Sequence, residues 1–95
     1  MITAIVLVHV ESDRIPEVAQ EIAELDGVSE VYSVTGGADL IAMVRVREHE
    51  ALADVIADRL SKVTGVRGTE THIAFRTYSR HDLDAAFSLG VEEAD

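Results

Sequence analysis

The feature that most constrains the fold of this chain is an internal repeat. Residues 25–28 (Leu-Asp-Gly-Val) recur as residues 63–66 (Val-Thr-Gly-Val), a shift of 38 positions. The same shift maps Val6 onto Val44, Val8 onto Val46, Val18 onto Ile56 and Ile22 onto Leu60. Two strand–helix–strand units in tandem, each with a right-handed crossover, predict an α+β fold of the ferredoxin-like βαββαβ type.

Hydrophobic periodicity places the elements of each unit. The expected strands are residues 2–10, 28–35, 38–47 and 66–78. The first helix is expected to have Ser12 or Asp13 as its cap, Pro16 in its first turn and Gly27 beyond its end. The second helix is predicted from apolar residues at helical spacing, followed by a glycine: Leu52, Val55, Ile56, Leu60, Val63 and Gly65.

A diglycine joins the two units. Gly36 and Gly37 lie between two runs rich in β-branched and apolar residues, which predicts a tight hairpin turn. Asp39 follows two residues later, where its carboxylate can cap the turn or bind the amine of a ligand.

One face of the predicted four-stranded antiparallel sheet is left uncovered, because both helices are expected on the other face. The uncovered face, here called the open face, collects alternate residues of all four strands: Thr3, Ile5, Leu7, His9, Glu30, Tyr32, Val34, Ile41, Met43, Arg45, Arg47, Glu70, His72, Ala74 and Arg76. This set is too apolar to face water alone. It predicts a face-to-face dimer or closure into a dimeric α+β barrel.

Charge and composition restrict the function further. Eight Lys and Arg side chains stand against 18 Asp and Glu, a net charge of −10, which argues against direct binding of nucleic acid. The chain has no cysteine, no run long enough to cross a membrane and no basic leader, so we expect a cytoplasmic protein. Residues 1–79 are predicted to form one domain, followed over residues 80–95 by a short amphipathic helix and an acidic tail.

Catalytic and metal-binding patterns are weak. The sequence lacks a cysteine nucleophile, a glycine-flanked serine and a lysine-bearing phosphate loop, so we predict no enzyme activity and no cofactor. His9 and His72 share the open face with Glu70, but interface hydrogen bonds account for them better than a metal does. An alternative is a small monooxygenase or isomerase of the dimeric α+β-barrel type, with His9, Tyr32, Arg45 and His72 lining the open face.

Two further segments suggest a binding site. Residues 35–40 contain the diglycine and Asp39, and residues 65–71 place Thr69 and Thr71 on one face of the last strand. A carboxylate, turn amides and two hydroxyls together can hold a zwitterion. The simpler interpretation is that threonine favours strands and that Asp39 caps its own turn.

These segments resemble a known family. The patterns Val-Tyr-Ser-Val-Thr-Gly-x-x-Asp-Leu-Ile and Gly-Val-x-x-Thr-x-Thr look like the ligand-binding (RAM) domain of the Lrp/AsnC regulators, over residues 2–75. The resemblance implies face-to-face dimers, rings of dimers such as octamers, and amino acids or similar effectors bound where dimers meet. It implies effector-binding roles for Gly36, Gly37, Ala38, Asp39, Thr69 and Thr71.

Departures from the family pattern shape the functional hypothesis. The chain starts at the first strand, without the helix-turn-helix domain of full-length members, so we expect a stand-alone version that does not bind promoters directly. Ala38 stands where many members carry an aromatic residue, which bears on effector size. We expect a homo-oligomer that regulates amino-acid metabolism by itself or with full-length relatives. A purely structural adaptor is a third possibility.

Overall fold

Alternation along the two central strands divides the sheet into a buried and an open face. In the computed structural model, which describes residues 1–80, the even-numbered residues from 4 to 10 and from 40 to 46 are buried. The odd-numbered residues between them are half-buried or exposed. The predicted assignment of side chains to the two faces is therefore confirmed on both central strands.

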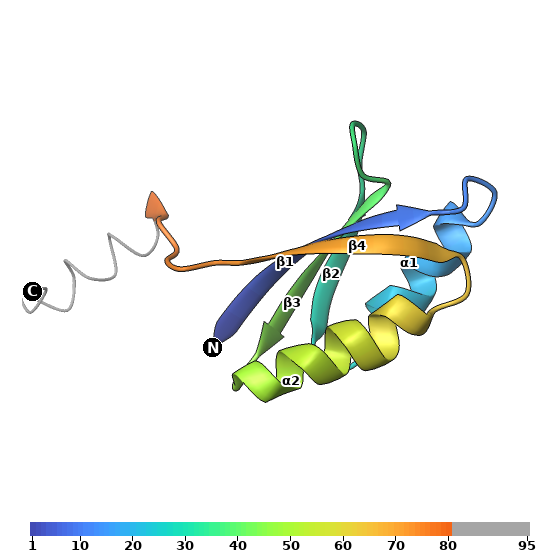
Figure 1. Ribbon diagram of the computed structural model, residues 1–95. Helices are drawn as coiled ribbons and strands as arrows, with labels where there is room; N and C mark the ends of the chain where they lie inside the picture. The colour runs from blue at the N-terminus through green and yellow to red at the C-terminus, as the bar shows by residue number, and fades with distance from the viewer. Residues whose placement is uncertain (81–95) are drawn as a thin grey trace, which may run out of the picture.

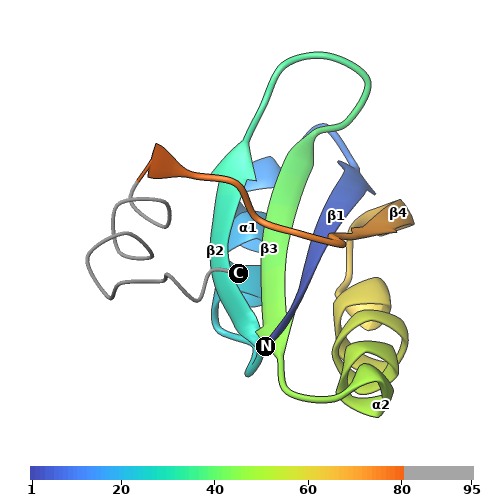
Figure 2. The same cartoon turned by 90° about the vertical axis from the view of Figure 1, so that its left-hand side faces the viewer.

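The elements follow the predicted βαββαβ order. They are β1 (Ile2–Val10), α1 (Ile15–Ala23), β2 (Val28–Ser33), β3 (Leu40–Val46), α2 (His49–Ala53), the π-helical turn η1 (Asp54–Arg59), the 3-10 turn η2 (Leu60–Lys62) and β4 (Val66–Ile73). The strands pair antiparallel in the order β2-β3-β1-β4. Both helical layers lie against one face (Figures 1 and 2), where Val18, Ile22, Leu52, Val55 and Leu60 complete the core.

Each helical segment is followed by a glycine that lies close to a valine in the helical segment of the other repeat unit. Gly27, after α1, has φ +95°, and a Cβ built there would lie 2.8 Å from Cγ2 of Val55 in the second helical segment. Gly65, after the second helical segment, has φ +104°, and its Cβ would lie 2.8 Å from Cγ2 of Val18 in α1. Only glycine fits both the backbone conformation and the contact. The recurring glycine of the repeat is thus explained by reciprocal packing.

The repeat does not keep a single shift along the chain. The N–H of Glu11 donates to the carbonyl of Gly65, and the N–H of Arg45 donates to the carbonyl of Gly27. Glu11 and Arg45 are therefore equivalent although they lie 34 positions apart in the sequence, not 38. The predicted equivalence of Val6 and Val44 in the repeat was wrong for this reason. Both side chains nevertheless point into the core as predicted, because an error of four residues preserves the alternation.

The second helix also departs from the pattern. Val55 is buried and Ile56 only partly, so Val55 is the counterpart of Val18. The π-helical turn η1 widens the helix by one residue at this point, and Leu60, the counterpart of Ile22, is again in the core.

Three local predictions were wrong. The diglycine does not form a two-residue turn, because the last β2–β3 pair is Ser33 with Leu40 and the N–H of Val34 donates to the carbonyl of Asp39. The longer loop projects beyond the sheet (Figure 1). Arg14, not Ser12 or Asp13, occupies the first cap position, with no side-chain hydrogen bond, and β4 ends at Ile73 instead of residue 78.

The predicted C-terminal helix of residues 80–90 and the acidic tail lie outside the described residues, apart from Arg80. Within residues 1–80, none of the helices has the length and apolar character needed to span a bilayer.

Candidate functional site: a polar cleft at the end of the sheet

Asp39 connects the loop after β2 to the end of β1. Its N–H donates to the carbonyl of Val8 at 3.0 Å, and its carboxylate Oδ2 accepts the N–H of Val10 at 2.8 Å. The side chain therefore binds the backbone of the neighbouring strand β1 and does not cap its own turn. Within residues 1–80 the other carboxylate oxygen, Oδ1, accepts no hydrogen bond, so half of the carboxylate can bind another group.

A β-bulge lies beside Asp39 on β4. His9 of β1 pairs with Gly68, whereas the next residue, Val10, pairs with Val66. Arg67 is thus the extra residue that faces no partner in the ladder. Strict alternation would place its side chain with Thr69 on the helix side. A bulge can redirect a side chain, and Arg67 lines a cleft together with His9 and Gly68 of the open face.

These residues surround one open cleft of about 350 Å³, lined by His9, Asp39, Arg67 and Gly68. It combines a carboxylate, a guanidinium and an imidazole from three strands or strand ends. The guanidinium of Arg67 lies 3.9 Å from a carboxylate oxygen of Glu11, and the Arg67 side chain is 67% exposed. This contact is long and exposed, so it holds Arg67 only weakly and leaves the guanidinium able to turn toward a ligand.

Only one of the six predicted effector residues lines this cleft. Gly36 and Gly37 lie exposed in the projecting loop, with nothing within 4 Å of an added Cβ, and Ala38 is buried at the base of that loop. Thr69 pairs with Val8 and Thr71 with Val6, whose side chains point into the core. Both threonines therefore lie on the helix side of β4.

Arg67 and Gly68 were within the segment singled out in the sequence but were not chosen as binding residues. A signal was present, because a glycine inside a strand commonly marks a bulge or a place where another group approaches the backbone. For His9 the sequence suggested interface hydrogen bonds, metal binding or catalysis, but not effector binding. Its place in the cleft depends on strand order and register, which bring β1, β3 and β4 together.

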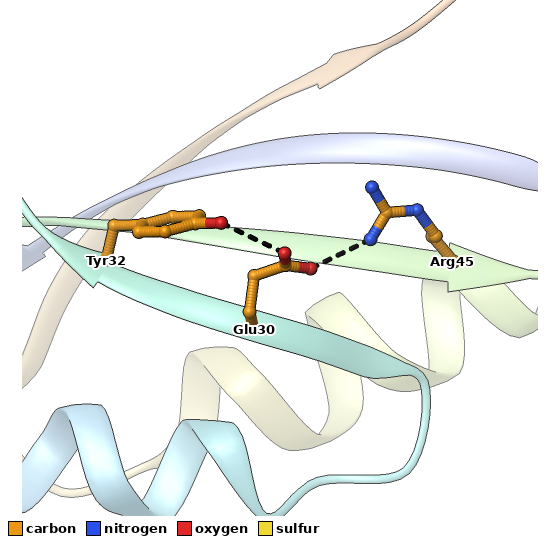
Figure 3. Close-up of polar contacts among 3 residues, drawn as sticks. All are labelled: Glu30, Tyr32 and Arg45. Carbon is orange, nitrogen blue, oxygen red and sulfur yellow. Dashed lines mark hydrogen bonds and ion pairs between the residues drawn. The ribbon is translucent and has the colours of Figure 1, made fainter. Parts of the chain in front are cut away.

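A second polar cluster occupies the open face over β2 and β3 (Figure 3). Arg45 Nη1 and the hydroxyl of Tyr32 each donate a 2.9 Å hydrogen bond to a different carboxylate oxygen of Glu30. The bond from Arg45, followed by that from Tyr32, holds the pKa of Glu30 below its usual value. The bond to Glu30 raises the pKa of the Tyr32 hydroxyl. Glu30 is therefore satisfied within the chain.

The residues of the alternative enzyme hypothesis do not converge. Tyr32 and Arg45 share Glu30, His72 Nε2 lies 3.0 Å from a carboxylate oxygen of Glu70, and His9 lies apart in the cleft. Within the part of the chain that the structure describes, no three His, Asp or Glu side chains form a group able to hold a metal ion.

The sheet, its two helices and its topology place the chain among the small α+β domains of the ferredoxin-like class. A sequence model of the Lrp/AsnC ligand-binding domain matches residues 3–83, so the chain belongs to this family. Domains of the family bind small effectors such as amino acids and oligomerise in transcriptional regulation, and they are not enzymes. The predicted family, fold class and lack of enzyme activity are thereby confirmed.

Individual relatives agree with this assignment. A protein of Thermus thermophilus is 48% identical, with a TM-score of 0.79 over 84% of this chain and 100% of that chain. An uncharacterised helix-turn-helix-type transcriptional regulator of Pyrococcus furiosus is 36% identical over 76% of this chain but only 49% of its own length. This chain thus spans about half the length of the curated relatives that it matches.

A more distant structure shares the fold alone. A transcriptional regulator of Neisseria meningitidis, solved as a complex with L-Met, has a TM-score of 0.75 at 16% identity over 83% of this chain and 53% of that chain.

Proposed function

We propose that this chain binds an α-amino acid, or a similar small zwitterion, in the cleft formed by His9, Asp39, Arg67 and Gly68. The observation that carries the proposal is a carboxylate and a guanidinium lining the same open cleft. Asp39 receives the α-ammonium group and Arg67 the α-carboxylate, since charge-assisted hydrogen bonds of this kind are the strongest that a small ligand can make.

The hydrogen bonding of the Asp39 carboxylate supports this role. Oδ2 is held by the N–H of Val10, so the carboxylate is already fixed in position before a ligand arrives. Such preorganisation lowers the entropy lost on binding. Oδ1 then accepts the ammonium group without breaking any bond of the fold.

The other predicted effector residues do not line the cleft of a single chain, and we propose that they contribute to the site in the assembled oligomer. We propose that copies associate through their open faces, where Ile5, Leu7, Ile41 and Met43 are only half-buried in the single chain. Dimers then join in rings such as octamers, and the loop of residues 35–38 and the threonines of β4 complete the site at the seam between dimers.

Regulation follows from unequal affinity. An effector shifts the balance between assembly states only if it binds one state more tightly than another. The proposed output is control of transcription in amino-acid metabolism, in the cytoplasm, through the homo-oligomer or through mixed oligomers with full-length relatives. The strongly acidic chain itself is not proposed to bind nucleic acid.

Calorimetric titration with amino acids tests the site, with L-methionine as the first probe because the Neisseria regulator was solved with it. Asp39→Asn keeps an oxygen for the N–H of Val10 but removes the charge, so the fold is retained and affinity falls about 10- to 100-fold. Asp58→Asn, an exposed change in η1, is the matched control and leaves affinity unchanged. Equal affinity of Asp39→Asn and the unmodified chain, or no binding of any amino acid, would refute the proposed site.

A further inference from the structure

We infer that Gly68 determines which amino acids the cleft accepts, because the missing side chain at this position leaves room for the side chain of the effector. The inference rests on the proposed function and adds to it the position of the ligand side chain and its chemical class.

Neither the backbone nor the packing of the chain requires glycine at this position. The φ of Gly68 lies outside the left-handed region, unlike that of Gly27 or Gly65. A Cβ added at Gly68 would meet nothing within 4 Å, whereas one added at Gly27 or Gly65 would lie 2.8 Å from a valine methyl group. Glycine in a strand weakens the strand. The open space above it is therefore a property of the cleft and not of the fold.

The first unit of the repeat shows which residue occupies the position equivalent to Gly68. Between β2 and β3, Val28 pairs with Val44 and Glu30 with Met43, so Ser29 is the extra residue of a bulge. Arg67 is the extra residue of the bulge in β4. Each bulge lies two residues after the corresponding glycine turn, at Gly27 and Gly65. The residue after the first bulge is Glu30, and its counterpart after the second is Gly68.

The two equivalent positions after the bulges differ in whether they carry a side chain. In the first, the Glu30 side chain lies on the open face and is held by Arg45 and Tyr32 (Figure 3). In the second, the same position carries no side chain. An effector whose α-carbon lies between Asp39 and Arg67 directs its side chain over Gly68, where this chain has none of its own.

The surroundings define the class of side chain. Beyond Gly68 on the open face, Leu7 pairs with Glu70, whose carboxylate lies 3.0 Å from His72 Nε2. The carboxylates of Glu70 and of Glu11, which lies 3.9 Å from Arg67, repel a negatively charged side chain. The cleft is therefore suited to amino acids with an uncharged side chain, such as methionine, and disfavours glutamate.

Titration calorimetry with glycine, L-alanine, L-methionine and L-glutamate tests the inference on the unmodified chain, Gly68→Ala and Gly68→Val. We expect the unmodified chain to bind L-methionine about tenfold more tightly than glycine, from partial burial of its side chain. Gly68→Val should remove this preference, and Gly68→Ala should reduce it. The affinity for glycine, which has no side chain to clash, should fall less in Gly68→Ala than the affinity for L-methionine does.

Ser29→Thr is the matched control, because it also adds one carbon atom to an exposed strand position but at the opposite edge of the sheet. It should keep the methionine preference, and circular dichroism checks that all variants are folded. If amino acids bind but Gly68→Val retains the methionine preference, the inference is wrong and the proposed function stands. If the unmodified chain binds no amino acid, both are wrong.

Discussion

Replacing Gly27 with alanine should destabilise the protein by an amount that the structure allows to be divided into two parts. The first part is backbone strain, because Gly27 has φ +95° and a non-glycine residue there costs about 1–3 kcal/mol. The second is steric, because the new Cβ would lie 2.8 Å from Cγ2 of buried Val55, and overpacking of this kind costs about 1–3 kcal/mol. The lower entropy of the unfolded chain offsets about 0.4–1 kcal/mol.

Gly36→Ala separates these parts. Gly36 has φ +108°, close to that of Gly27, but nothing lies within 4 Å of its added Cβ. It therefore carries the strain without the clash, and its expected cost is about 0–2.5 kcal/mol. The difference between the two variants, about 1–3 kcal/mol, measures the contact with Val55.

Urea unfolding followed by far-UV circular dichroism gives these free energies, with all variants at one protein concentration because association shifts apparent stability. Adding Val55→Ala to Gly27→Ala should recover most of the steric cost, so the double-mutant cycle should show favourable coupling. Gly27→Ala and Gly36→Ala with equal stability, and no coupling to Val55, would refute the explanation of the repeated glycine.

Two further predictions concern the open face. Arg45→Gln should raise the pKa of Glu30 toward its ordinary value of 4.5, and Tyr32→Phe should raise it less, because the bond from Arg45 is the larger cause; carbon-detected NMR titration measures both. Since the folded pKa of Glu30 is lowered, its contribution to stability is present above the unfolded pKa and is lost as pH falls through the folded pKa. Ile41→Asp should abolish self-association in sedimentation experiments, while Ala57→Asp on the helix side should not; a dimer that persists in Ile41→Asp would exclude the open face as the interface.

The fold could be predicted from the sequence because its determinants are local and repeated. Alternation along residues 2–10 and 38–47 fixed which side chains enter the core, and this pattern survives errors in element boundaries. The shift of 38 residues failed on β1 because helix length and loop length differ between the two units. A π-helical turn absorbs one such difference, and hydrophobic spacing alone could not have distinguished Val55 from Ile56 as the buried residue.

The site was harder to predict because it depends on register. Asp39 was chosen for its place near a turn, but its partner is the N–H of Val10, 29 residues away. Thr69 and Thr71 share a face, as predicted, but strand pairing places that face against the helices. Arg67 reaches the cleft only through a bulge, and a bulge reverses the alternation from which strand faces are assigned.

The duplication gives a physical reason for the position of the cleft. In each unit the glycine turn is constrained by the valine of the opposite helix, and the bulge follows at a fixed distance. The residue after the bulge does not enter the core, so it can differ between the units without disturbing the packing of the core. In the first unit it is Glu30, whose charge is satisfied by Arg45 and Tyr32. In the second it is Gly68, which adds no side chain to the cleft that it lines with Asp39, so this position can receive part of a ligand where the first unit carries a side chain of its own.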